Sequence, residues 1–179
     1  MTTPTNIGVI GLGAMGRGMA ASLRRAGYLV HVCDVRPEAA QAFAAEGGVA
    51  CANPAEVAAH CEALVSVVVN AAQTEAVLFG DANGQGGAAA AMRAGSVFIM
   101  CSTVDPGWSV ALEGRLAERG LLYLDAPISG GAAKAASGQM TMMTAGSPAA
   151  YAKAGDALDA MAAKVYRLGD RAGNGSKVK

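Results

Sequence analysis

The chain has 179 residues, which suffices for one α/β domain with a buried core and is too short for two ordinary domains. Its 14 basic and 14 acidic side chains balance, without the basic excess typical of nucleic-acid-binding proteins. No apolar run reaches the roughly 18 residues of a membrane span, and residues 1–6 lack the charged start and apolar run of a signal peptide. We therefore expect a cytoplasmic protein that binds a small molecule, and neither a nucleic acid nor a membrane.

Strand-like and helix-like segments alternate along the chain, with short connections. The expected strands, rich in valine, isoleucine and leucine, cover residues 6–10, 28–33, 49–51, 63–69, 96–100, 121–124, 139–144 and 164–168. The expected helices cover residues 15–26, 38–46, a segment from 54 capped by Asn53, 74–79, 106–119 and 148–161. This alternation predicts one α/β domain over residues 1–179, a doubly wound Rossmann-type and mostly parallel sheet with helices on both faces.

A glycine-rich turn joins the first expected strand to the first expected helix. It reads GxGxxG and consists of Gly11, Leu12, Gly13, Ala14, Met15 and Gly16. Gly11 permits a tight turn, Gly13 lets a pyrophosphate approach the backbone, and Gly16 lets the helix pack on the strand. The motif alone is weak in a chain with 24 glycines, but its place between a strand and a helix N-terminus predicts dinucleotide binding.

An acidic residue ends the second expected strand. Asp34 follows Gly16 at close to the spacing of roughly 20 residues expected of a ribose-binding acid. Its carboxylate would accept hydrogen bonds from the ribose hydroxyls and repel a 2′-phosphate, which favours NAD over NADP. Arg36 leaves NADP open, because an arginine there could pair with a 2′-phosphate or stack on adenine. The alternative is a solvated acid at a strand end.

The cysteines and histidines do not form a metal-binding pattern. The chain has four cysteines and two histidines, with no CxxC pair: Cys33, Cys51, Cys61, Cys101, His31 and His60. We expect no metal site, and buried, reduced thiols instead.

Four motifs, in order, resemble those of the 3-hydroxyisobutyrate dehydrogenase family, the β-hydroxyacid dehydrogenases. They are the glycine turn of residues 7–16, an S-T-x-x-P segment at 102–106, D-A-P-I-S-G-G at 125–131 and G-x-G-x-x-x-K at 173–179. Residues 70–73 and the final five residues are similar to the L-threonate dehydrogenase branch. Val68-Val69 stands where other members commonly have Leu-Pro, a departure at the nicotinamide-ribose contact. In the family an all-helical second domain follows the lysine and holds most subunit contacts, so we expect an NAD-binding domain without it, and a homo-oligomer only with it.

The resemblance implies a role for each motif. Lys179 would be the general acid/base, with Lys177 as its rival, although a frayed terminal lysine is the plain alternative. Ser129, Gly130 and Gly131 would bind the substrate carboxylate, unless they form only a turn. The cofactor would also contact Thr103 and, on the same geometric argument, Val69 and Asn70. Ser102 or Thr103 could instead cap the helix near Pro106. Asp125 would orient its loop, and the remaining side chains noted would pack: Trp108, Met140, Met142 and Met143.

Three functions follow from these features. The first is a dehydrogenase that passes hydride from a small hydroxy acid, such as the sugar acid L-threonate, to NAD while Lys179 takes the hydroxyl proton. The second is an NADPH-dependent reductase of a small aldehyde acid, such as glyoxylate or a semialdehyde. The third is a nucleotide-binding module without catalysis.

Overall fold

The computed structural model describes residues 5–179. Residues 1–4, on which the expectation about a signal peptide partly depends, lie outside the described residues. Among the described residues, no helix combines the length and the apolar character needed to cross a membrane.

The described chain alternates strands and helices, as expected. In chain order the elements are β1 (Asn6–Ile10), α1 (Ala14–Arg25), β2 (Leu29–Cys33), α2 (Pro37–Ala45), β3 (Val49–Ala50), α3 (Pro54–His60), β4 (Ala63–Ser66), α4 (Ala71–Phe79), β5 (Val97–Met100), α5 (Pro106–Ala117), β6 (Leu122–Asp125), β7 (Ile128–Ser129), α6 (Gly131–Ala136), β8 (Met140–Gly146), α7 (Pro148–Met161), β9 (Ala162–Arg167) and α8 (Asn174–Val178).

The sheet is mostly parallel and doubly wound, which confirms the predicted fold class. Its strand order is β3-β2-β1-β4-β5-β6-β8-β7, and β9 pairs with β8. The pairs from β3 through β6 are parallel, whereas β8 is antiparallel to both β6 and β7. The chain leaves β1 toward β2 on one side and reaches β4 on the other, so the strand order reverses between β1 and β4. Open α/β sheets bind ligands at such a point.

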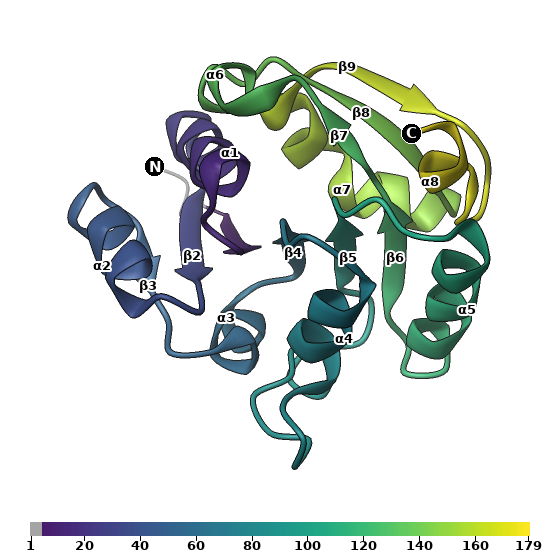
Figure 1. The fold of residues 1–179 in the computed structure, drawn as a ribbon, viewed down its shortest axis with the longest axis horizontal. Coiled ribbons are helices and arrows are strands. Elements are labelled where there is room, and N and C mark those ends of the chain that lie inside the picture. The colour runs from purple at the N-terminus through teal and green to yellow at the C-terminus, as the bar shows by residue number, and fades with distance from the viewer. Residues whose placement is uncertain (1–4) are drawn as a thin grey trace.

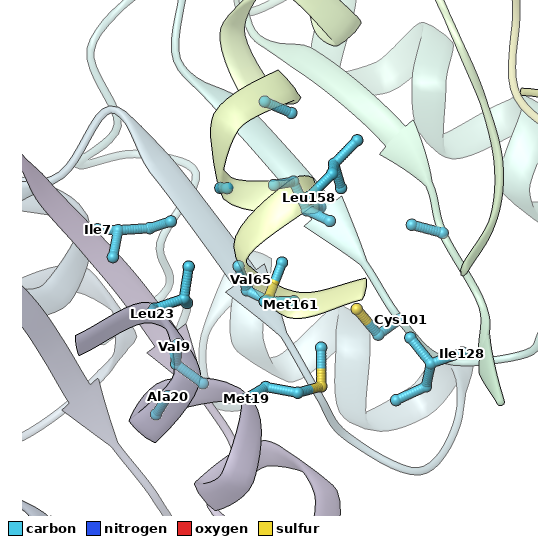
Figure 2. Close-up of a cluster of buried hydrophobic side chains, with 14 of the residues drawn as sticks. Ile7, Val9, Met19, Ala20, Leu23, Val65, Cys101, Ile128, Leu158 and Met161 are labelled. Carbon is cyan, nitrogen blue, oxygen red and sulfur yellow. The ribbon is translucent and has the colours of Figure 1, made fainter. Parts of the chain in front are cut away.

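Two apolar layers cover the sheet, one on each face. The first contains buried side chains of α1, α2 and α7, and the second contains those of α3, α4 and α5. Figure 1 shows α1, α6 and α7 on one side of the sheet and α3, α4 and α5 on the other. In Figure 2, Met19 and Leu23 of α1 lie beside Leu158 and Met161 of α7. Residues at two distant parts of the chain thus share one core, which fixes the position of the β1–α1 turn.

Several boundaries differ from the sequence expectation. Strand β4 ends at Ser66 rather than at residue 69, and α4 begins at Ala71 rather than at residue 74 because the Asn70 side chain caps it. The N-cap of α5 is Asp105, whose carboxylate accepts a hydrogen bond from Trp108 N, so the suggestion that Ser102 or Thr103 caps this helix was wrong. The sequence reading also missed β7, α6 and α8.

Candidate functional site

Loops from five strands meet at one edge of the sheet. The carboxyl ends of parallel strands share an edge, so the loops after β1, β2, β4, β5 and β6 emerge together there. All the residues predicted to bind the cofactor lie in these loops or at the start of the helices that follow them. The structure therefore groups the predicted cofactor residues on one side of the molecule.

The three glycines of the β1–α1 turn have different surroundings. Gly11 has a φ of +97°, and a Cβ there would collide with the carbonyl oxygen of Val67. A Cβ on Gly16 would collide with the carbonyl oxygen of Gly11, so Gly16 has the close-packing role expected of it. A Cβ on Gly13, in contrast, meets no atom of the described residues within 4 Å. Packing therefore explains Gly11 and Gly16, and leaves Gly13 without a packing reason.

Helix α1 begins with open backbone donors. Gly13 is its N-cap and supplies no side-chain hydrogen bond, and no acidic residue lies in the first turn among the residues described. The N-terminus of a helix carries unpaired N–H groups and a partial positive charge, which together favour an anion. The β1–α1 turn thus has both the space and the polarity that a pyrophosphate requires.

The Asp34 carboxylate links the end of β2 to this turn. Its Oδ2 accepts a hydrogen bond of 2.7 Å from Leu12 N, and its Oδ1 accepts one of 2.9 Å from Arg36 N. Burial by itself would raise the pKa of Asp34, but these two backbone bonds and the nearby Arg36 guanidinium lower it below its usual value. The side chain is therefore an anion at neutral pH, as an acceptor of ribose hydroxyl hydrogen bonds must be.

A hollow of 370 Å³ lies beside the turn, between α1 and α2. It is lined by Leu12, Gly13, Ala14, Arg17, Arg36, Glu38 and Ala39. The Arg36 guanidinium, 3.5 Å from Asp34 Oδ1, is mostly exposed, and Arg17 pairs with Glu46. Asp34 does not line the hollow, but its carboxylate accepts hydrogen bonds from two residues that do, Leu12 and Arg36. An adenosine group placed in the hollow would contact an acidic side chain, Glu38, and basic ones, Arg17 and Arg36.

The loops after β4 and β5 are fastened to each other. Ser102 is buried and donates a hydrogen bond of 2.6 Å to the carbonyl oxygen of Val68. The neighbouring Thr103 is exposed, and so is Val69, whose backbone N–H donates to Gln73 Oε1. The Asn70 Oδ1 accepts a bond from Gln73 N, so this side chain has a structural partner. The side chains of Thr103 and Val69 are thus exposed to solvent, and hydrogen bonds hold the backbone of their two loops in place.

The loop after β6 holds the residues predicted to bind a carboxylate. Ser129, Gly130 and Gly131 are exposed, and the two glycines have φ values of +139° and +77°. Positive φ values of this kind favour glycine, and turns that bind anions through backbone N–H groups use similar left-handed residues. The side chain of Lys134 lies against Gly130 and adds a positive charge to this loop, which the sequence reading did not include.

Helix α8 carries Lys177 and, as its C-cap, Lys179. Lys179 is exposed, and its backbone N–H donates to the carbonyl oxygen of Gly175 at 3.1 Å. The helix packs against α5, β6 and β8, as Figure 1 shows near the C-terminus. Lys179 therefore closes the last turn of α8, and this helix lies next to the end of β6.

The buried thiols are not suited to act as nucleophiles at this edge of the sheet. All four cysteines are free, and Cys33, Cys61 and Cys101 are buried, as expected of reduced thiols. Burial raises the pKa of each of these three to about 12, which keeps them protonated at neutral pH. Within residues 5–179, the His, Cys, Asp and Glu side chains form no group able to hold a metal ion.

Residues 6–169 match the family described as the NAD binding domain of 6-phosphogluconate dehydrogenase. The chain is 63% identical over 174 residues to the L-threonate dehydrogenase of Cupriavidus necator, with 97% of this chain and 57% of the relative covered. It is 41% identical over 179 residues to that of Pectobacterium atrosepticum, with 99% and 58% covered. Among solved structures, the 3-hydroxyisobutyrate dehydrogenase of Salmonella typhimurium superposes with a TM-score of 0.91 at 42% identity, over 97% of this chain and 59% of that one. The chain thus spans a little more than half the length of these relatives.

Proposed function

We propose a function from one premise: this chain belongs to the family of NAD-binding domains of the 6-phosphogluconate dehydrogenase type, and within it to the 3-hydroxyisobutyrate dehydrogenase group. Its proposed role is to bind NAD and to supply most of the reacting groups of a dehydrogenase that oxidises a small hydroxy acid. L-threonate is the proposed substrate, because the two relatives described above are named L-threonate dehydrogenases.

The observation that carries the proposal is the space at Gly13. A backbone N–H at a helix N-terminus with no side chain over it fits a pyrophosphate, and Gly13 has no packing reason to be glycine. Asp34, charged and held beside the same turn, fits the adenosine ribose. The residues present therefore suit the dinucleotide that the family binds.

In the proposed mechanism, this chain binds the cofactor and the substrate, orients them, and moves a proton. The cofactor supplies the hydride acceptor. The exposed backbone and hydroxyl of Ser129–Gly131, with Lys134 nearby, would bind the substrate carboxylate, and Lys179 would take the proton from the hydroxyl as the carbon is oxidised. In the reverse reaction Lys179 would return that proton to the carbonyl oxygen.

One observation favours a second candidate, an NADPH-dependent reductase of a small aldehyde acid. The hollow beside the turn is lined by two arginines, Arg17 and Arg36, and guanidinium groups bind phosphate well. We favour NAD because Asp34, which is held against Leu12 and Arg36 of the hollow, carries a negative charge that opposes a 2′-phosphate.

An activity assay tests the proposal and separates the two candidates. The 179-residue chain would be fused to the C-terminal part of the Cupriavidus necator enzyme that lies beyond the matched region. The assay measures NADH formation from L-threonate and other small 2- and 3-hydroxy acids, with NADP in parallel. We expect turnover by the fusion and none by the chain alone, because the matched region covers only 57% of that relative.

Lysine variants of the fusion complete the test. Lys179→Ala should lower kcat by about 10²- to 10⁴-fold, the usual contribution of a general base, whereas Lys177→Ala should retain activity. Full activity of Lys179→Ala would remove the catalytic assignment. Faster turnover with NADP than with NAD would favour the reductase, and a fusion that binds NADH but never turns over would favour a binding module.

A further inference from the structure

We propose that Asp125 is a positioning residue that fixes the helix bearing Lys179 to the loop that binds the substrate carboxylate. The proposal rests on the role of Lys179 given above. It adds that the Asp125 carboxylate determines the position of this lysine. Asp125 itself lies under the helix and does not reach the surface, since its exposed fraction is 0%.

The Asp125 carboxylate is bound to α8 by three hydrogen bonds. Its Oδ2 accepts from Gly173 N and from Ser176 N, each at 3.0 Å, and its Oδ1 accepts from Ser176 Oγ at 2.7 Å. These two backbone N–H groups belong to the N-terminal turn of α8, where helix donors have no partner within the helix. One carboxylate therefore satisfies the start of the helix and ties it to the end of β6.

Close packing supports the same contact. A Cβ on Gly175 would lie 2.5 Å from the carbonyl oxygen of Met143 and 3.0 Å from that of Asp125, so the helix lies directly on β6 and β8. Glu113 of α5 holds the segment just before the helix, because its Oε2 accepts a bond of 3.0 Å from Ala172 N. Two carboxylates, Asp125 of β6 and Glu113 of α5, thus hold residues 172–176 through hydrogen bonds.

Asp125 connects the loop proposed to bind the substrate carboxylate to the helix that carries Lys179. Asp125 is the last residue of β6, and only Ala126, Pro127 and Ile128 separate it from Ser129–Gly131. On the other side, Ser176 lies within the turn that ends at Lys179, whose N–H bonds to Gly175. A shift of the anchor would therefore move the lysine relative to the substrate loop, and a displacement of about 1 Å can lower a rate by on the order of 100-fold.

The first experiment measures amide hydrogen exchange in the 179-residue chain, without substrate. In the wild type, the amides of Ser176, Lys177 and Lys179 should be protected. Asp125→Ala should speed their exchange by about tenfold or more, since it removes three bonds to a charged acceptor, and Ser176→Ala should have a smaller effect in the same direction. The matched control is Asp170→Ala, an exposed acid that should change nothing.

The conservative variant separates positioning from general stability. In Asp125→Asn, the amide oxygen can still accept from the two N–H groups and the NH₂ can donate to Ser176 Oγ, so protection of α8 should largely return. Amides of β4 and β5 should keep their protection in Ser176→Ala and Asp125→Asn. Unprotected α8 amides in the wild type, or unchanged α8 exchange in Ser176→Ala, would overturn the proposal even if Asp125→Ala failed to fold.

The second experiment uses the fusion enzyme. Ser176→Ala should lower kcat with little change in KM for NAD, and Asp125→Asn should keep most of the kcat that Asp125→Ala loses. Equal kcat in Ser176→Ala and wild type would contradict a positioning role. Full activity of Lys179→Ala would instead refute the proposed function, while the exchange result on the Asp125 anchor would remain, so the two failures are distinguishable.

Discussion

Among single residues, the glycines of the β1–α1 turn separate folding from binding. Gly13→Ser should leave the free energy of unfolding unchanged or raise it by a few tenths of a kcal/mol, because Gly13 is an uncapped N-cap with φ −70° and serine is a favoured N-cap. Gly16→Ser should lower that free energy by about 1–3 kcal/mol or more, since its Cβ would strike the Gly11 carbonyl oxygen. Denaturant unfolding of both variants measures the difference. Equal losses in the two would contradict the assigned roles.

The sequence reading worked best where a residue's role is local. The GxGxxG spacing, Asp34 at the end of a strand and Asn53 as a helix cap all depend on neighbours a few residues away, and the structure places each at the predicted element boundary. Contacts between residues far apart in the sequence could not be predicted. The bond from Ser102 to Val68 spans 34 positions, and that from Ser176 to Asp125 spans 51, so no local pattern indicates them.

At the scale of elements, β2 and α3 meet at two histidines, His31 and His60. The rings of His31 and His60 are stacked with centroids 5.1 Å apart, and His31 Nε2 lies 3.0 Å from Asn6 Oδ1. The buried Nδ1 of His31 has no hydrogen-bond partner among the described residues. Burial first, and His60 second, lower the pKa of His31 below 6.5.

This contact predicts a loss of stability in mild acid. The unfolded chain binds a proton at His31 more tightly than the folded chain, so the free energy of unfolding should fall as pH drops from about 7.5 to about 5.5. Denaturant midpoints at the two pH values measure it. His31→Gln should flatten the dependence in that window, with Asp170→Asn as a control that keeps it. A dependence equally steep in His31→Gln would show that another group is responsible.

Most elements of regular length were predictable, and so was the two-residue strand β3, whereas the short elements β7, α6 and α8 were not. Helix α7 was predicted to the residue, because its 14 residues carry a full helical pattern between Pro148 and Met161. Strand β7 has two residues and exists through its pairing with β8, and α8 has five residues held by Asp125 and Glu113. Such elements are defined by their partners in the fold, which the sequence alone does not reveal.

For the whole molecule, apolar layers cover both faces of the sheet, and the loops at the carboxyl ends of the parallel strands remain as the proposed place for ligands. The glycine turn, Asp34, Thr103, the Ser129–Gly131 loop and Lys179 come from separate parts of the sequence, and the parallel strands bring their loops to that edge. The architecture thus places the proposed cofactor residues, which follow β1, β2, β4 and β5, beside the proposed substrate and proton-transfer residues near β6 and α8.

The most direct test of this account is a titration of the 179-residue chain with NADH, followed by the change in NADH fluorescence. The wild type should show saturable binding at micromolar to millimolar cofactor. Gly13→Val should abolish it, because a side chain would occupy the space left for the pyrophosphate. Gly155→Val, at a glycine of α7 that also has open space around it, should bind as the wild type does. The same binding curve for Gly13→Val and wild type, or no saturable binding by the wild type up to millimolar NADH, would contradict the central claim.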